Sequence, residues 1–224
     1  MEYNKKFNKS KFGKFFIKNT NRIIKIGDYF YDKKICGCSL IRYVPSLYRE
    51  SKGATGSQST HYVILDEIFQ NAVFSENDCF IDVGCGKGRI LAYMLREKFP
   101  GEIHGIELNQ EVGDYCKAWA EKYPQVHVNV GDAFALNYDK YTVMFMGRPF
   151  LPDMFHQFIE KLEQDMTHPL KLYYWVDQQS GDFLNDRPGW NMHRREWIYK
   201  KNGFYLASSP QRYSVWTYTP AKNL

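Results

Sequence analysis

The 224-residue sequence lacks three features that would assign it to other classes of protein. It contains no run of about 20 apolar residues, so we expect no transmembrane segment. Its five cysteines are odd in number and form no disulfide framework, which favours a reducing, cytoplasmic compartment. The pair Cys36-Gly37-Cys38 has no second cysteine or histidine pair to complete a site, so we predict no bound metal.

Apolar and aromatic residues are plentiful. Hydrophobic residues make up 44% of the chain and aromatic residues 17%, which is enough for the full core of one domain. The 17 tyrosines suit half-buried positions along a groove or over a sheet, because each ring has an apolar body and a polar tip.

The stretch from Cys79 to Leu91 has the pattern of a strand, a glycine turn and a helix. A short apolar run ending at Val83 predicts a buried strand, and a helical apolar pattern begins at Ile90. The three glycines between them are Gly84, Gly86 and Gly88. In this geometry the backbone passes close to a bound nucleotide. Asp82 at the strand end suits a ligand with an ammonium group better than a pyrophosphate, which points to S-adenosylmethionine.

Three segments carry a resemblance to a known family. Residues 80–88 resemble motif I of the class I S-adenosylmethionine-dependent methyltransferases. Residues 103–109, with Glu107, resemble the second strand of that family. Residues 126–133, which include Asp132, resemble the third strand.

The resemblance implies a set of cofactor contacts. In the family, an acid at the position of Glu107 binds ribose hydroxyls, and one at the position of Asp132 contacts the adenine amine. The segment before motif I covers the methionine end of the cofactor, which makes Thr60 a candidate. The other implied positions are Asp82, Gly84, Cys85, Gly86, Gly88, Leu108, Ala133 and Met146.

The resemblance covers residues 58–219 and implies an α/β fold with a doubly wound, mostly parallel, seven-stranded sheet. We predict a methyltransferase domain at 58–224 and a basic N-terminal extension at 1–57. Apolar runs predict strands at 79–83, 102–107, 126–130, 140–146, 170–176, 193–199, 204–208 and 211–219, the last three antiparallel. Helices are predicted at 89–98, 110–122 and 153–164.

Residues 1–26 differ in charge from the rest of the chain, with eight basic residues and one acid. Phe12, Phe15 and Ile23 recur at roughly helical spacing. The segment is either a basic amphipathic arm that touches an anionic partner or a helix docked on the catalytic domain with its lysines in water. The anionic partner could be RNA or a membrane surface. Residues 27–57 show no clear period.

The turn after the predicted fourth strand bears on the acceptor. Methyltransferases that act on exocyclic amines of bases carry Asn/Asp-Pro-Pro-Tyr there, whereas this chain has residues 147–150, Gly-Arg-Pro-Phe, which counts against adenine N6 as the acceptor. Arg148 could bind a carboxylate or phosphate of the acceptor, or form a surface ion pair. Candidate bases or orienting groups are Tyr48, His61 and Asp177.

The run Gly105-Ile-Glu-Leu-Asn109 and the phenylalanine-rich turn are also loosely similar to the seven-strand protein lysine methyltransferases. We therefore favour a cytoplasmic S-adenosylmethionine-dependent methyltransferase that acts on nitrogen or oxygen of a protein or small molecule. An RNA methyltransferase that uses the basic arm is the second hypothesis. A binding module that holds the cofactor without transferring its methyl group is the third.

Overall fold

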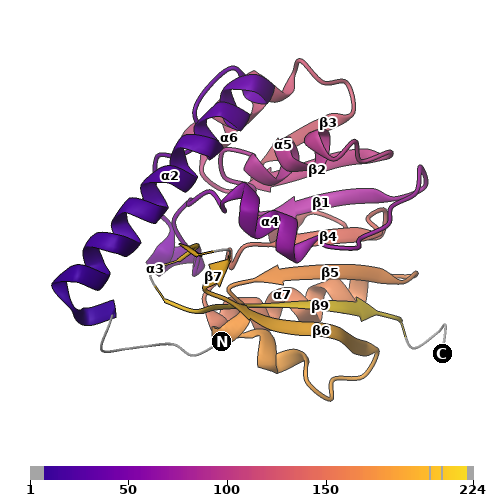
Figure 1. The fold of residues 1–224 in the computed structure, drawn as a ribbon. Coiled ribbons are helices and arrows are strands. Elements are labelled where there is room, and N and C mark those ends of the chain that lie inside the picture. Colours follow the sequence, from indigo (N-terminus) through magenta and orange to yellow (C-terminus); the bar gives the residue numbers. More distant parts are fainter. Residues whose placement is uncertain (1–7, 202, 208, 221–224) are drawn as a thin grey trace.

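Seven strands form one sheet in the order β3-β2-β1-β4-β5-β9-β6 (Figure 1). The computed structural model describes residues 8–201, 203–207 and 209–220. Strands β1 to β5 are parallel, and β9 is antiparallel to β5. β6 pairs antiparallel with β9 and therefore runs in the same direction as β1 to β5, so the prediction of an antiparallel strand at 193–199 is wrong in its direction. The sheet strands are β1 Cys79–Val83, β2 Glu102–Glu107, β3 Val126–Val130, β4 Val143–Met146, β5 Leu170–Trp175, β6 Trp190–Ile198 and β9 Gln211–Tyr218. The doubly wound, seven-stranded fold predicted from the sequence is confirmed.

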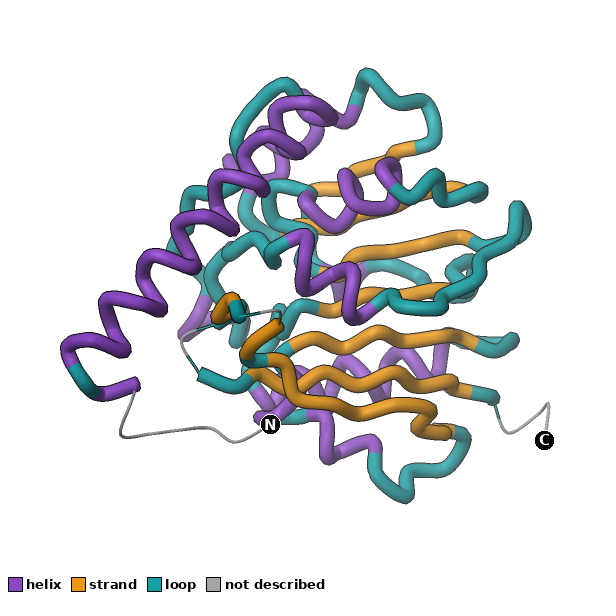
Figure 2. Tube along the Cα trace, in the orientation of Figure 1, coloured by secondary structure: helices purple, strands orange, loops and turns teal. Residues whose placement is uncertain are grey.

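Helices cover both faces of this sheet (Figures 1 and 2). On one face lie α4, α5 and α6, with α2 along one side, and α7 covers the other face. The helices are α2 Lys11–Cys36, α3 Arg49–Lys52, α4 Tyr62–Ile68, α5 Arg89–Arg96, α6 Gln110–Ala120 and α7 Pro152–Asp165. No helix within the described ranges is long and apolar enough to cross a membrane.

The side chains of β1 alternate between two cores. Phe80 packs with α4 and α5, whereas Ile81 packs with the apolar side of α7. A parallel strand that is buried on both faces reads as an apolar run, which is why β1 could be predicted from sequence. Within that strand the acid Asp82 is an exception, and it lies where the chain turns toward α5.

The prediction that residues 204–208 form a strand of the main sheet is wrong. β8, Phe204–Tyr205, pairs instead with β7, Lys200–Lys201, in a separate hairpin. The position beside β9 is already taken by β6, so the sheet has no place for another strand there. The hairpin packs against α2 through Tyr205, whose ring meets Phe16 edge-on at 6.1 Å between centroids.

Helix α2 extends well beyond the part of the chain with a recognisable period. Ser10 caps its start, accepting a hydrogen bond from the Gly13 amide at 2.9 Å, and Gly37 ends it with φ of 74°. Residues 27–36 therefore continue the helix, although their sequence shows no clear period. The reason is that Asp28 and Asp32 occupy the buried face of the helix, where an apolar residue would be expected. The predicted domain boundary at 57/58 stays a prediction.

Candidate active site

A cavity of about 270 Å³ lies at the carboxyl ends of the parallel strands. The glycine turn after β1, the ends of β2 and β3, and the turn after β4 contribute to its wall. The segment 52–60 supplies another part of the lining. Crevices outside the carboxyl ends of strands are the usual ligand sites of open α/β sheets. The volume is close to the lower end of the roughly 300–1,000 Å³ typical of small-molecule sites.

Nine of the predicted cofactor residues line this cavity. They are Thr60, Asp82, Gly84, Cys85, Gly86, Glu107, Leu108, Asp132 and Ala133. The three acids come from the ends of three adjacent strands, which the parallel sheet brings to one edge. The strand order of the sheet therefore places Asp82, Glu107 and Asp132 in the wall of one cavity.

Asp82 is a buried acid with incomplete hydrogen bonding. Asp82 is only 2% exposed, and its Oδ2 atom has no hydrogen-bond partner among the described residues. Burial raises the pKa of Asp82 well above its usual value, and the negative charge of Glu107 raises this pKa further. A buried, unpaired carboxylate oxygen at a cavity wall is suited to a cationic hydrogen-bond donor from a ligand.

Glu107 at the end of β2 is fixed by the glycine turn. Its Oε2 accepts a hydrogen bond from the Gly86 amide at 2.8 Å, and its Oε1 accepts one from the Asn109 amide at 2.9 Å. Burial raises the pKa of Glu107, while the amide hydrogen bonds oppose that rise. The carboxylate keeps further lone pairs that can accept hydrogen bonds from hydroxyl groups in the cavity.

Asp132 follows β3 and has two partners. Its Oδ1 accepts a hydrogen bond from the Phe134 amide, and its Oδ2 pairs with Nζ of Lys52, each at 2.9 Å. Partial burial acts to raise the pKa of Asp132, but these two donors outweigh it and lower the pKa. Asp132 is therefore ionised and able to accept a hydrogen bond from a ligand amine.

The glycines of the turn serve different purposes. Gly84 and Gly86 line the cavity with φ of 76° and 55°, and a Cβ at Gly86 would lie 2.4 Å from Oγ of Ser57. Gly88 does not line the cavity, contrary to its predicted cofactor contact. A Cβ there would lie 2.4 Å from Sγ of Cys116, so Gly88 allows α5 to pack closely against α6.

Residues 44–57, which we call the strap, cross the carboxyl edge of the sheet and are tied to the turn after β4. The Thr55 amide donates to the Pro149 carbonyl at 2.9 Å, and the Leu151 amide donates to the Gly53 carbonyl at 2.7 Å. The Thr55 hydroxyl donates to the Arg148 carbonyl at 2.7 Å. These bonds hold the small residues of the strap against the cavity.

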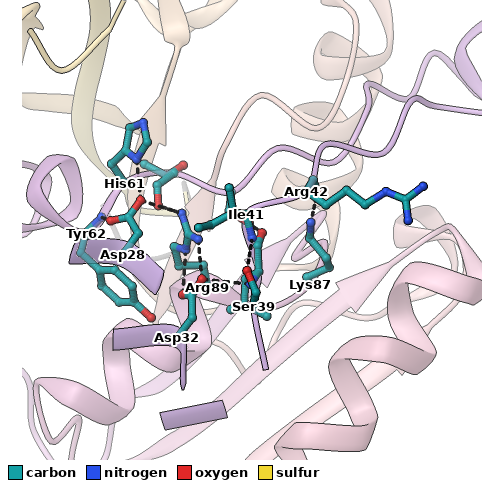
Figure 3. A network of polar contacts seen from close by, with 12 residues as sticks. Asp28, Asp32, Ser39, Ile41, Arg42, His61, Tyr62, Lys87 and Arg89 are labelled. Atoms are coloured by element: carbon teal, nitrogen blue, oxygen red, sulfur yellow. Dashed lines mark hydrogen bonds and ion pairs between the residues drawn. The ribbon is translucent and has the colours of Figure 1, made fainter. Parts of the chain in front are cut away.

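His61 belongs to a buried ion-pair network rather than to the cavity (Figure 3). Its Nδ1 lies 2.5 Å from Oδ2 of Asp28, which also pairs with Nη1 of Arg89 at 3.0 Å. Figure 3 shows that the imidazole, Asp28 and Arg89 converge on one another. The candidate role of His61 as a base for the acceptor is therefore not supported by its position, because the ring is bonded to the α2 carboxylate.

Asp177 has a structural position as well. The residue is 0% exposed, and its carboxylate accepts hydrogen bonds from Nε of Arg212 and from the Ser214 hydroxyl, each at 2.5 Å. A side chain enclosed by partners from β9 cannot reach an acceptor in the cavity. The position of Asp177 therefore does not support its predicted role as a base.

Three other predicted residues do not line the cavity. Met146 is buried in the core beside α7, because its position in β4 points it to that face of the sheet. Tyr48 is half-buried at the N-cap of α3. Arg148 adopts a left-handed φ of 54°, which directs its carbonyl to the strap, while its neighbours Gly147 and Pro149 line the wall.

Several lining residues were not predicted from the sequence. Lys52, Ser57 and Phe134 are among them, as is Lys87 inside the glycine turn. Burial lowers the pKa of Lys87 to about 8, and its ammonium donates to the Arg42 carbonyl. The small residues of the strap were a usable signal, because such residues allow close approach to a ligand.

One group of described residues could hold a metal ion. It consists of Cys79, Glu102 and His104, whose ligand atoms lie within 4.8 Å of one another. These residues lie toward the amino ends of β1 and β2, at the opposite edge of the sheet from the cavity. Any ion held there would not take part in chemistry in the cavity.

Residues 80–164 match the model of a known family, described as a methyltransferase domain. Over these residues the chain is therefore similar to a methyltransferase domain. The match begins in β1 and ends in α7, so it includes the glycine turn and all three acids of the cavity. No curated protein matches the chain in sequence.

Solved structures share the fold at low sequence identity. An RNA methyltransferase from Salinibacter ruber, in complex with S-adenosylhomocysteine, is 18% identical, with a TM-score of 0.50 over 73% of this chain and 94% of that one. TrmK, an M1A22 tRNA methyltransferase of B. subtilis, is 10% identical, with a TM-score of 0.54 over 70% and 65% of the two chains. TrmN from Thermus thermophilus is 12% identical, with a TM-score of 0.55 over 70% and 49%.

The family match and the methyltransferase fold together confirm the prediction of an S-adenosylmethionine-dependent methyltransferase. At these identities, the structures indicate a common fold and carry no information on the acceptor of this methyltransferase domain. The assignment of individual residues to cofactor and acceptor stays a prediction.

Proposed function

We propose that the methyltransferase domain binds S-adenosylmethionine in the 270 Å³ cavity and transfers its methyl group to a nitrogen acceptor on a protein or small molecule. The observation that carries this proposal is the convergence of Asp82, Glu107 and Asp132 on one cavity, with Oδ2 of Asp82 left without a partner among the described residues. When bound, S-adenosylmethionine supplies an electrophilic methyl group.

Each acid has one role in this proposal. Asp82 holds the ammonium of the methionine end, which completes the hydrogen bonding of the buried carboxylate. Glu107, oriented by the Gly86 and Asn109 amides, accepts from the ribose hydroxyls. Asp132 accepts from the adenine amine.

A nitrogen acceptor is favoured by the residues that surround the cavity. Its lining includes no histidine and no tyrosine from the described part of the chain. His61 and Asp177, the candidate bases, are hydrogen-bonded outside the cavity, and the lining acids are assigned to the cofactor. The lining lysines also have partners, since Lys52 donates to Asp132 and Lys87 to the Arg42 carbonyl. A hydroxyl acceptor needs a base, whereas a neutral amine attacks through its own lone pair and then releases its proton to water.

The polar residues of the rim can orient such an amine. Thr55 and Ser57 of the strap and Gln157 of α7 all line the cavity with uncharged hydrogen-bonding groups. Orienting the acceptor nitrogen toward the methyl group can contribute several kcal/mol to lowering the barrier, about 7–11 kcal/mol at most.

Thermal unfolding tests cofactor binding. S-adenosylmethionine or S-adenosylhomocysteine at about 100 times its dissociation constant adds about 2.7 kcal/mol of stability. For a chain of this length, that corresponds to a rise in Tm of roughly 5–10 °C. NAD is the control and should leave Tm unchanged. A flat response to both sulfur ligands in folded, ligand-free protein would overturn the assignment of the cavity.

Mass spectrometry of the methylated product tests the acceptor. The protein is incubated with isotopically labelled S-adenosylmethionine and separate pools of peptides, small amines, hydroxyl compounds and RNA. A label on nitrogen of a peptide or amine supports the proposal, and a label on oxygen contradicts it. A label in RNA would support the RNA alternative. Tight cofactor binding without label in any pool would support the binding-module alternative.

A further inference from the structure

Helix α2 carries a solvent-exposed apolar stripe, in which Ile23 borders a groove between the helix and the domain. Phe15, Ile23, Ile26 and Phe30 are spaced by eight, three and four residues, which keeps them on one side of a helix with 3.6 residues per turn. Phe15 is 65% exposed, Ile26 53% and Phe30 67%. The stripe spans about 22 Å at 1.5 Å per residue.

A second face of α2 is basic. Its members are Lys11, Lys14, Lys18, Arg22 and Lys25, spaced by three, four, four and three residues. Every exposed charged side chain of α2 is basic, because its two acids, Asp28 and Asp32, are buried. The field at this surface is therefore positive along most of the helix.

The third face of α2 attaches the helix to the domain. Oδ2 of Asp32 lies 2.6 Å from Nη2 of Arg89, and Asp28 pairs with the same guanidinium (Figure 3). Ile17 packs with Tyr199 and Tyr205 near the start of the helix. The attachment fixes the rotation of α2, so that the apolar stripe and the basic face stay exposed.

We infer that α2 is an interfacial helix that docks the methyltransferase on an anionic lipid surface. A helix with an apolar face beside a lysine-rich face lies in the plane of a membrane, with the apolar side chains in the acyl boundary and the cations at the head groups. RNA would use the basic face, but Ile23 and Ile26 offer nothing to phosphates or base edges. The stripe therefore favours lipid over RNA.

Docking through α2 has a consequence for the active site. The helix runs beside the carboxyl ends of the parallel strands, the edge that carries α3 and the strap (Figure 1). An anionic membrane bound by α2 would therefore lie on the side of the molecule that carries the cavity. Residues 1–7, with Lys5 and Lys6, belong to the predicted basic arm but lie outside the described residues.

Vesicle flotation with the full chain tests this inference. The probes are vesicles of phosphatidylcholine alone and vesicles with phosphatidylcholine and phosphatidylserine in roughly equal amounts, which differ in surface charge. We expect binding to the anionic vesicles and not to the neutral ones. Binding to neither kind overturns the inference.

Paired variants separate the two faces. Ile26→Ser with Phe30→Ser should weaken binding to anionic vesicles at least about tenfold, because two buried apolar side chains are lost. Lys18→Gln should weaken it about fivefold, since each lysine near an anionic surface contributes about 1 kcal/mol. Val73→Ser and Lys98→Gln alter exposed residues outside α2 and should leave binding unchanged.

RNA binding and self-association give distinct outcomes. Salt-dependent binding of a mixed tRNA pool that is weakened by Lys18→Gln and unaffected by the serine variant, without vesicle binding, would replace lipid by RNA. A dimer in sedimentation that the serine variant converts to a monomer, again without vesicle binding, would mean that a second copy covers the stripe. Either result overturns the lipid assignment, and Tm shifts with S-adenosylmethionine remain a separate test of the cavity.

Discussion

Lys52 and Asp132 meet at the cavity, with Nζ of the lysine 2.9 Å from Oδ2 of the aspartate. Eighty positions separate the two residues in the sequence. The pair links the strap to the acid that we assign to the adenine amine. The carboxylate that we propose to bind the adenine amine is thus also the partner of a lysine of the chain.

Replacing Lys52 tests this competition. Lys52→Met should tighten S-adenosylmethionine binding by up to about fivefold, because an exposed ion pair is worth at most about 1 kcal/mol. Isothermal titration calorimetry gives the Kd. Arg49→Met, on the same short helix, is the matched control and should bind as the wild type does. Weaker binding by Lys52→Met would instead mean that the lysine contacts the cofactor.

The unpartnered oxygen of Asp82 leads to a prediction about affinity. Asp82→Asn should weaken S-adenosylmethionine binding by about 2–5 kcal/mol, because the ammonium would be left in a buried site without its counter-charge. Glu76→Gln removes an exposed acid and should have no effect on the Kd. An unchanged Kd for folded Asp82→Asn would contradict the assigned contact.

The same variant should alter the pH dependence of stability. Burial raises the pKa of Asp82 in the folded state, so the folded protein holds this proton more tightly than the unfolded chain does. The free energy of unfolding of the cofactor-free protein therefore falls as pH rises through that raised pKa. Asp82→Asn should lack this loss, and its advantage over wild type should disappear below about pH 4. Urea unfolding across pH measures the difference, and parallel curves would refute the prediction.

Gly86 and Gly203 both have a left-handed backbone, but only Gly86 has a close neighbour where a Cβ would lie. Comparing alanine variants of the two glycines therefore separates a steric clash at the cavity from backbone strain. Gly86→Ala should weaken cofactor binding at least about tenfold, because a methyl group here meets Oγ of Ser57 at 2.4 Å and moves the turn that orients Glu107. Gly203→Ala, at φ of 85° with nothing within 4 Å, should cost only about 1–2 kcal/mol of stability. Equal Kd values for the two variants would show that Gly86 has no part in the site.

The ion pair between Asp32 and Arg89 should contribute more to the stability of the protein than a more exposed ion pair does. Asp32→Ala leaves a buried guanidinium with one partner fewer and should cost about 3–5 kcal/mol of unfolding free energy. Asp66→Ala, at the more exposed pair with Arg96, should cost less than about 1 kcal/mol. Similar costs for the two alanine variants in chemical denaturation would count against a buried anchor.

Local sequence patterns were sufficient to predict the sheet and many of the residues that line the cavity. Burial on both faces makes β1, β4 and β5 largely apolar runs, and acids at or just after the ends of β1, β2 and β3 are visible in the sequence. Parallel strands bring those ends to one edge whatever the loops between them do. Asp82, Glu107 and Asp132 could therefore be assigned to one cavity before the fold was known.

The positions of the remaining candidate residues depended on hydrogen-bond partners that are distant in sequence. His61 and Asp177 have side chains suited to base catalysis, and no nearby residue reveals that one bonds to Asp28 and the other to Arg212. The acids of α2 hid its helical period because they face the core, where Arg89 compensates their charge. Burial and pairing depend on which surfaces meet in three dimensions, and those contacts turned two candidate bases into structural residues and a basic segment into an anchored helix with an exposed apolar stripe.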